Sequence, residues 1–244
     1  MSPDNHASPV PGSPQWWLKQ APREQKSGVR GRPSLSFDKI ISTALETVEE
    51  VGSQAFNMRM LADRLESGTA TLYRHFESKD EIFAFVADRF LGELLTDEPD
   101  YLHMTWQEAC AFSTSRFYNS LAAHPNIVPL LVAQIPIGPN GLELRERLLA
   151  MLIGAGFSPQ LAASAYTTIA HYVLGFAGQL SPAAHTDVSA SNELGAFFRR
   201  LDASKFPTTV KIAPHLSSSS ISDEFHFGLK LIIAGLERSL TTQV

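Results

Sequence analysis

The stretch between residues 57 and 81, NMRMLADRLESGTATLYRHFESKDE, contains two short helical patterns and constrains this chain more than any other feature. Asn57 is a favourable N-cap, and the apolar residues after it predict a first helix over Met58–Leu65. A second helix is predicted over Thr69–Phe76, with Leu72 and Phe76 directed inward. Two helices joined by a short turn form a helix-turn-helix, whose second helix can enter the major groove of DNA. The outer surface of that second helix would carry Thr69, Ala70, Thr71, Tyr73, Arg74 and His75.

The break between the two helices is Glu66-Ser67-Gly68. Gly68 is the residue best able to adopt a positive φ, so we expect the turn to depend on it. After the second helix, Ser78-Lys79-Asp80-Glu81 has the S-x-x-E form of a capping box, in which the two side chains each accept a backbone N–H. This pattern predicts a third helix that begins at Ser78 and continues to about Leu94.

Together, LADRL, TLYRHF and SKDEIF resemble the DNA-binding motif of the TetR family of bacterial transcriptional regulators. The family usually has glycine, an aliphatic residue and serine where this chain has Glu66, Ser67 and Gly68. We therefore expect the turn to be re-formed around Gly68, which would affect the angle of the second helix.

The resemblance implies DNA-contacting roles for residues of the second helix and its flank. The matching positions are Tyr73 and Lys79 for phosphates, with Thr71 and His75 beside them, and Thr69, Ala70 and Arg74 for bases. Arg74 is the best placed of these to read guanine through paired hydrogen bonds. Arg59, near the start of the first helix, is a further candidate for a phosphate or base contact. The competing interpretations are a half-buried core aromatic for Tyr73 and solvated side chains for Arg59 and Arg74.

Residues 1–35 hold six of the fifteen prolines and show no helical period, so we expect a mostly disordered basic arm. Trp16-Trp17 is interpreted as an apolar pair in a flexible tail, with docking onto the body of the protein as the alternative. Arg30-Gly31-Arg32-Pro33 resembles the core of an AT-hook, and an extended arm can carry Arg30 and Arg32 into the minor groove. An ordinary basic linker is the alternative.

The formal net charge of −5 argues against a nucleic-acid partner until its distribution is considered. Residues 1–36 carry a net charge of +3, and residues 37–95 carry −5. Basic side chains nevertheless gather in or beside the expected DNA face, whereas several acids lie on the helix before it. A local basic footprint is sufficient for DNA binding by an acidic protein.

The length of 244 residues allows one or two domains with a substantial core. We find neither an apolar run long enough to span a membrane nor a signal peptide, and we expect a cytoplasmic protein without a membrane partner. Cys110 is the single cysteine, which excludes an intrachain disulfide and fits a reducing cytoplasm.

Helical periodicity continues through the rest of the chain. Further helices are expected over residues 37–51, 106–124, 127–133, 142–155, 158–180 and 223–240, with 192–201 as another candidate. The expected fold class is all-α. After the arm of residues 1–35, we expect a three-helix helix-turn-helix DNA-binding domain over 36–80. A helical ligand-binding and dimerisation domain would occupy 81–244.

The segments HPNIVPLL, GPNGLEL and DEFHFGLKLIIAGLE resemble the C-terminal domain of the tetracycline-repressor-like branch. In that branch, the helices that match residues 158–180 and 223–240 pair with their symmetry mates, so the resemblance implies a homodimer. The alternative is that both helices belong to the core of the monomer. A ligand cavity is expected between the helices. Its candidate lining residues are Trp106, Cys110, Ser113, Phe117, His124, Tyr166, His171 and Tyr172, with plain core packing as the alternative for each.

The resemblance implies a repressor that binds a palindromic operator in double-stranded DNA and is released by a small-molecule effector. An activator, or a sensor with altered or lost DNA binding, is the alternative within the same fold. An enzyme is disfavoured because the sequence lacks a G-x-S-x-G elbow, a P-loop, a G-x-G-x-x-G motif and an H-E-x-x-H motif. The spacing of the eight histidines does not suit zinc, so neither a metal nor a cofactor is expected.

Overall fold

A computed structural model of the chain describes residues 9–20, 35–96, 103–180, 188–216 and 220–242. Within these ranges the secondary structure is helical, as the all-α prediction requires. None of the helices found there combines the length and apolarity needed to cross a membrane. The helices are α1 (Pro14–Gln20), α2 (Phe37–Ala55), α3 (Met58–Arg64), α4 (Thr69–Tyr73), α5 (Lys79–Glu93), α6 (Trp106–Ala123), α7 (Val128–Ala133), α8 (Pro139–Gly154), α9 (Pro159–Gly178), α10 (Val188–Arg199), α11 (Pro207–Leu216) and α12 (Ile221–Thr241).

The N-terminal helical unit is built on α2, which packs against α5. Ser36 caps α2 by accepting the N–H of Lys39, and the apolar face of the helix is buried at Ile40, Ile41, Ala44 and Val48. Gly52 adopts φ of 75°, which interrupts the regular helix directly after residue 51, where the helix was predicted to end, and a final turn follows to Ala55.

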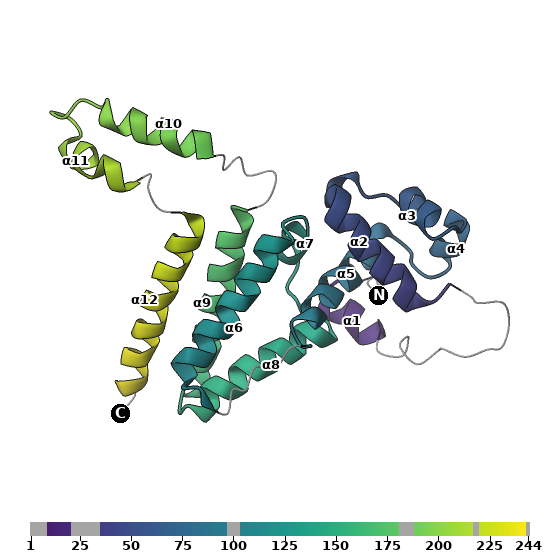
Figure 1. Cartoon of the computed structure of the whole chain (residues 1–244). Coiled ribbons are helices and arrows are strands. Elements are labelled where there is room, and N and C mark those ends of the chain that lie inside the picture. Colours follow the sequence, from purple (N-terminus) through teal and green to yellow (C-terminus); the bar gives the residue numbers. More distant parts are fainter. Residues whose placement is uncertain (1–8, 21–34, 97–102, 181–187, 217–219, 243–244) are drawn as a thin grey trace, which may run out of the picture.

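Helix α5 joins this unit to the C-terminal body (Figure 1), in which α9 packs on α6, α8 and α12. The carboxylate of Asp88 in α5 accepts hydrogen bonds from the backbone N–H groups of Asn140 and Gly141, at 3.3 and 3.0 Å. These N–H groups lie in the first turn of α8, where a negative charge is favoured by the helix dipole. Asp88 therefore fixes the start of α8 on α5.

A hairpin of α10 and α11 stands apart from the body in Figure 1. Helix α10 occurs near the predicted segment 192–201 but begins earlier, at Val188. The sequence did not indicate α11, which contains Pro214 and follows a short turn at residues 200–206. Proline within a short helix weakens the sequence signal, because it removes a backbone donor.

The N-terminal arm differs from the prediction over residues 9–20. Residues 14–20 form α1, and Trp16 is buried with 3% of its surface exposed. The interpretation of Trp16-Trp17 as a pair in a flexible tail is therefore wrong, and the alternative of docking onto the body is correct. The pair packs against Phe85 of α5, with ring centroids 5.1 and 5.3 Å away. The buried Trp16 ring and the partly buried Trp17 ring remove apolar area from water at this contact, which the proline content of the arm does not indicate.

Candidate nucleic-acid interface and ligand cavity

The helix-turn-helix has the predicted order, with the second helix held by two buried side chains. Leu72 and Phe76 are 0% and 1% exposed, and they anchor the segment from inside as their spacing predicted. Helix α4 covers Thr69–Tyr73, and two further residues continue in a turn before Phe76. The outer face of this short helix is therefore fixed relative to α2 and α5.

The turn between α3 and α4 differs from the prediction. Glu66 has φ of 49°, in the left-handed region, whereas Gly68 has φ of −83° and is the N-cap of α4. The expectation that Gly68 supplies the positive φ is wrong. The reversal instead occurs directly after α3, where the N–H of Ser67 reaches the carbonyl of Ala62 at 2.9 Å. Glu66 thus occupies a backbone conformation that usually selects glycine.

Side chains of the second helix form an exposed surface. Thr69, Ala70, Tyr73 and Arg74 are exposed, and Tyr73 retains 56% of its accessible surface. The interpretation of Tyr73 as a half-buried core aromatic is therefore not supported. Arg74 donates a hydrogen bond to the hydroxyl of Thr71 at 3.2 Å, which draws its guanidinium along the same face.

Further predicted DNA contacts flank this surface. Lys79 is exposed at the first position of α5, with its ammonium 5.7 Å from the ring centroid of Phe83. His75 is partly buried beside Phe76, and Arg59 is exposed at the start of α3. Arg30 and Arg32 lie outside the described residues, so the minor-groove prediction stays a prediction.

Of the two hydrogen bonds predicted for the capping box at the start of α5, only one forms. Ser78 accepts the N–H of Glu81 at 3.3 Å, but the Glu81 carboxylate accepts the N–H of Glu77 rather than that of Ser78. Its second oxygen accepts a hydrogen bond from the indole Nε1 of Trp16 at 3.0 Å. Glu81 is 4% exposed, so two directional donors compensate a buried carboxylate. No local sequence pattern indicates this role, because the donor lies 65 positions away.

Arg64, the other basic residue of α3, is directed elsewhere. It forms an ion pair with Glu50 of α2, and the hydrogen bond from Arg64 lowers the pKa of that carboxyl group. This pairing ties α3 to α2 and removes Arg64 from the basic surface around α4.

A cavity of about 1270 Å³ lies within the C-terminal body, between the end of α5 and helices α6, α8 and α9. Ser113, Phe117, Tyr166 and His171 line it, as predicted. Most of the remaining wall is aliphatic, formed by Leu91, Leu94, Val132, Ile135, Leu144, Leu148, Leu149, Ile169, Val173 and Leu174. A largely apolar wall with a few polar groups is typical of a site for small organic molecules.

Four of the predicted lining residues lie elsewhere, so their assignment to the cavity wall is corrected. Trp106 packs edge-on against Phe157, with ring centroids 5.0 Å apart. Cys110 is fully buried, and burial raises the pKa of its thiol. His124 lies against α2, with Nδ1 2.6 Å from the Glu49 carboxylate.

Tyr172, the fourth, belongs to an aromatic cluster that includes Phe225 of α12. Its hydroxyl donates to the carbonyl of Phe225 at 2.7 Å, and its ring stacks on that of Phe225 with centroids 5.2 Å apart. Helical spacing indicates only that a residue faces inward. It does not distinguish the core from the cavity, because both are apolar.

The cavity also contains three arginines that the sequence did not single out: Arg116, Arg145 and Arg147. Arg145 Nε donates to the hydroxyl of Tyr166 at 3.0 Å, and its Nη2 donates to the carbonyl of Pro136 at 3.3 Å. The guanidinium carbon lies 5.3 Å from the Tyr166 ring centroid, within cation–π range. These contacts hold the guanidinium at the wall without involving a carboxylate.

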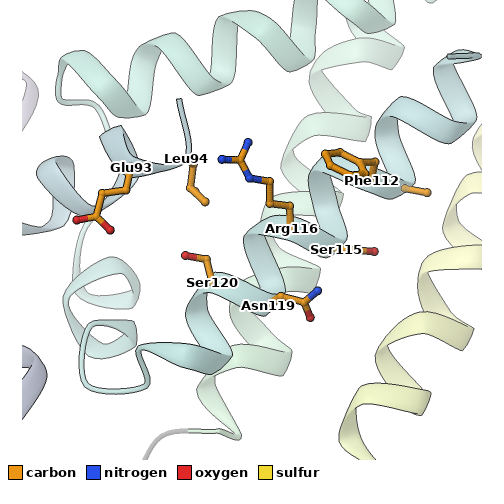
Figure 2. A pocket seen from close by; sticks show the side chains of 8 residues that line it. Glu93, Leu94, Phe112, Ser115, Arg116, Asn119 and Ser120 are labelled. Carbon is orange, nitrogen blue, oxygen red and sulfur yellow. The ribbon is translucent and has the colours of Figure 1, made fainter. Parts of the chain in front are cut away.

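A second, more open pocket of about 710 Å³ lies between the end of α5 and α6. Figure 2 shows Arg116 projecting from α6 toward Leu94, while the Glu93 carboxylate points away from it. Arg116 and Leu94 line both this pocket and the larger cavity. In the ranges that the structure covers, no group of three His, Cys, Asp or Glu side chains converges as a metal site requires.

Two family models match the chain. Residues 40–86 match "Bacterial regulatory proteins, tetR family", and residues 98–240 match "Tetracyclin repressor-like, C-terminal domain". An HTH-type transcriptional regulator of Saccharopolyspora erythraea is 27% identical over 209 residues, which cover 85% of this chain and 86% of that protein. Tetracycline repressor protein class E of Escherichia coli is 27% identical over 207 residues, covering 84% of this chain and 92% of the repressor.

Solved structures show the same architecture. Apo ActR from Streptomyces coelicolor superposes with a TM-score of 0.78 at 28% identity, covering 88% of this chain and all of that one. ActR in complex with actinorhodin gives a TM-score of 0.75 at 30% identity, covering 84% of this chain and 98% of ActR. The likeness extends over both the helix-turn-helix unit and the body that contains the cavity.

Proposed function

Because the chain belongs to the TetR family of bacterial regulatory proteins, it is a transcriptional regulator, and we propose that it is a repressor that binds a palindromic operator as a homodimer. A small-molecule effector in the C-terminal cavity would release it. The observation that carries this proposal is the exposed face of α4, with Tyr73 and Arg74 outward and Leu72 and Phe76 buried. A core-packed helix with a polar outer face is what insertion into a major groove requires.

We assign phosphate contacts to Tyr73 and Lys79, with Thr71 and His75 beside them. Thr69, Ala70 and Arg74 are assigned to base edges. The hydrogen bond between Arg74 and Thr71 supports this division, because it aligns the guanidinium with the outer face of α4. Arg59 adds a contact from the start of α3, and Arg30 and Arg32 are proposed to reach the minor groove.

The homodimer is supported by the apolar surface that α9 and α12 leave exposed. Phe227 and Leu231 of α12 are 66% and 58% exposed, one helical turn apart. Helix α9, which packs on α12, exposes small residues outside the cavity wall, and these permit close approach of another helix: Ser164, Thr168 and Gly178. This exposure argues against the alternative that both helices are entirely core of the monomer. A two-fold dimer would place two α4 helices on successive major grooves, about 34–36 Å apart.

Effector release is supported by the direct contacts between the cavity and the DNA-binding unit. Leu91 of α5 and Leu94 directly after it line the cavity, and Gly141, another lining residue, donates its N–H to Asp88 of α5. ActR, which is similar over both parts, has been solved with a small molecule bound. An effector that binds one arrangement of α5 and α8 more tightly would shift the population of DNA-binding dimers.

Selection of bound DNA from a random library, followed by anisotropy titrations, tests the DNA contacts. We expect Lys79→Ala to weaken binding to all sequences and to reduce the salt slope by about 1. Arg74→Ala should also relax preference at one base pair, by about 1–3 kcal/mol of discrimination.

Lys205→Ala is the matched control, since it removes an exposed positive charge from the turn before α11. The contact assignment is refuted if both variants near α4 bind the selected sequence as the unmodified protein does. Absence of binding to every sequence in the pool at low salt would instead favour a family member that has lost DNA binding.

A further inference from the structure

The charged side chains that line the large cavity are positively charged. Arg116, Arg145 and Arg147 are among its lining residues, and in the described part of the chain the wall includes no Asp or Glu. Arg147 pairs with the Glu143 carboxylate at 2.5 Å, and both side chains are over a third exposed. The partners of Arg145, in contrast, are a phenol hydroxyl and a backbone carbonyl.

A guanidinium at an apolar wall favours an anion for two physical reasons. The low local dielectric strengthens its attraction for a negative charge, and its planar fork can donate two parallel hydrogen bonds to a carboxylate. Two rings in the cavity wall offer flat apolar surfaces: that of Tyr166, beside Arg145, and that of Phe117 of α6. The volume of about 1270 Å³ accommodates a molecule of several fused rings.

We propose that the cavity binds planar aromatic anions, with Arg145 as the residue that recognises the negative charge. The inference rests on the proposed effector function of the same cavity. It goes beyond that function by stating the chemical class of the ligand: a multi-ring compound that carries a carboxylate or an acidic phenol.

A matched pair of probes tests the proposal: anthracene-2-carboxylate and the neutral anthracene-2-carboxamide, titrated by fluorescence into the intact protein. We expect the carboxylate to bind at least about tenfold more tightly, because only it can form charge-assisted hydrogen bonds. Arg145→Met should abolish that preference and leave carboxamide affinity unchanged. Arg200→Met, at an exposed site beyond α10, is the control and should retain the preference.

The proposal is overturned if the carboxamide binds as tightly as the carboxylate, if neither probe binds, or if Arg145→Met retains the preference. Operator binding measured in the same samples separates this failure from failure of the proposed function. Carboxylate binding without operator release would overturn the effector role alone. Operator release by both probes with equal affinity would overturn the ligand class alone.

A second inference comes from α1 and is independent of the ligand. The indole N–H of Trp16 donates to one carboxylate oxygen of Glu81. The other oxygen accepts the backbone N–H of Glu77, which directly follows the segment that contains α4. Trp17 packs on Phe85 of α5. On this side, α1 therefore contacts the residues that follow the DNA-reading helix.

The Trp17 ring and the residues just before α1 also contact the rim of the cavity. An atom of the Trp17 ring lies 2.8 Å from where a Cβ on Gly138 would stand, so the ring closely approaches the N-cap of α8. Gln134, which lines the cavity, packs against Gly12 just before α1. One short helix thus contacts both the start of α5 and the α7–α8 connection.

We infer that α1 holds the DNA-reading helix in a fixed position relative to the cavity rim. Hydrogen exchange on the full-length protein tests this inference. We expect Trp17→Ala to cause loss of protection in two separated segments, residues 72–81 and 134–141. Trp16→Phe, which keeps a ring but removes the donor to Glu81, should reduce protection in residues 72–81 and leave residues 134–141 protected.

Leu18→Ala is the control, because Leu18 is 79% exposed on the same helix. The inference is overturned if Trp17→Ala changes exchange only within residues 9–20, or only in one of the two segments. It is equally overturned if the Leu18 variant produces the same loss, since the effect would then not depend on the two indole rings.

Discussion

Glu66 shows how one residue can depart from its family pattern while the motif around it persists. It adopts φ of 49°, a conformation in which a Cβ approaches the neighbouring backbone. The family usually has glycine at this position, and this chain has its glycine two residues later, where φ is negative. The turn is imposed by burial of Leu61 and Leu72 on its two sides, because both must face the same core.

Glu66→Gly is therefore expected to stabilise the protein. Relief of the left-handed conformation contributes about 1–2 kcal/mol, and the extra freedom of glycine in the unfolded chain offsets about 0.5–1 kcal/mol. The measurement is urea unfolding followed by circular dichroism at fixed protein concentration. Gly68→Ser, which supplies a side-chain cap to α4, should add only a few tenths of a kcal/mol. A lower unfolding midpoint for Glu66→Gly would contradict the assignment of strain.

Helix α12 depends on a reciprocal cap at its N-terminus. The hydroxyl and N–H of Ser220 both donate to the Asp223 carboxylate, at 2.7 and 3.3 Å, and Asp223 N–H donates back to the hydroxyl. These bonds, with the side-chain bond from Ser220 as the largest cause, lower the pKa of Asp223 below its ordinary value of 3.8. The cap orients the first turn of the helix that is proposed to form the dimer.

Acidification is expected to weaken this cap. Because the folded-state pKa of Asp223 is lowered, the stabilisation is present above pH 3.8 and is lost as pH falls through the folded-state value. Ser220→Ala should move the pKa of Asp223 upward, toward 3.8, in a carboxyl-carbon NMR titration. Ser204→Ala, which removes the corresponding partner of Asp202, should leave Asp223 unchanged. An unshifted Asp223 in the Ser220 variant would disprove the role of the hydroxyl.

On the scale of the whole molecule, two of the exposed apolar surfaces of the described residues bear on assembly. One is the outer face of α9 and α12. The other is the α10–α11 hairpin, which projects from the body in Figure 1. Its exposed apolar side chains are Leu194, Phe197, Phe206, Ile212 and Leu216. Surface of this kind over two neighbouring regions indicates an interface.

Leu231→Glu is expected to produce a monomer at micromolar concentration, because the two-fold axis would bring two carboxylates into one apolar contact. Sedimentation velocity provides the measurement. Leu142→Glu is the matched control, since Leu142 of α8 is 48% exposed and lies outside the proposed interface. Unchanged sedimentation of the Leu231 variant would place the interface elsewhere, and a monomeric parent protein would refute the dimer.

Local signals in the sequence determined most of the helices and the helix-turn-helix. Caps at Ser36, Asn57, Ser78 and Ser158, and the inward pair Leu72 and Phe76, act within a few residues, so pattern alone reveals them. The exposed positions of α4 follow from the same period. The family resemblance then supplied the proposed partner, which periodicity does not encode.

Tertiary structure alone decided which inward residues face a core and which face the cavity. Ser113 and Phe117 reach the cavity whereas Cys110, on the same helix, is enclosed, because the difference depends on where α8 and α9 pack. It also decided that Trp16 joins Glu81 and that Glu66 takes the strained φ. Each of these outcomes depends on contacts between segments distant in sequence, or on constraints from a shared core, and no local pattern records them.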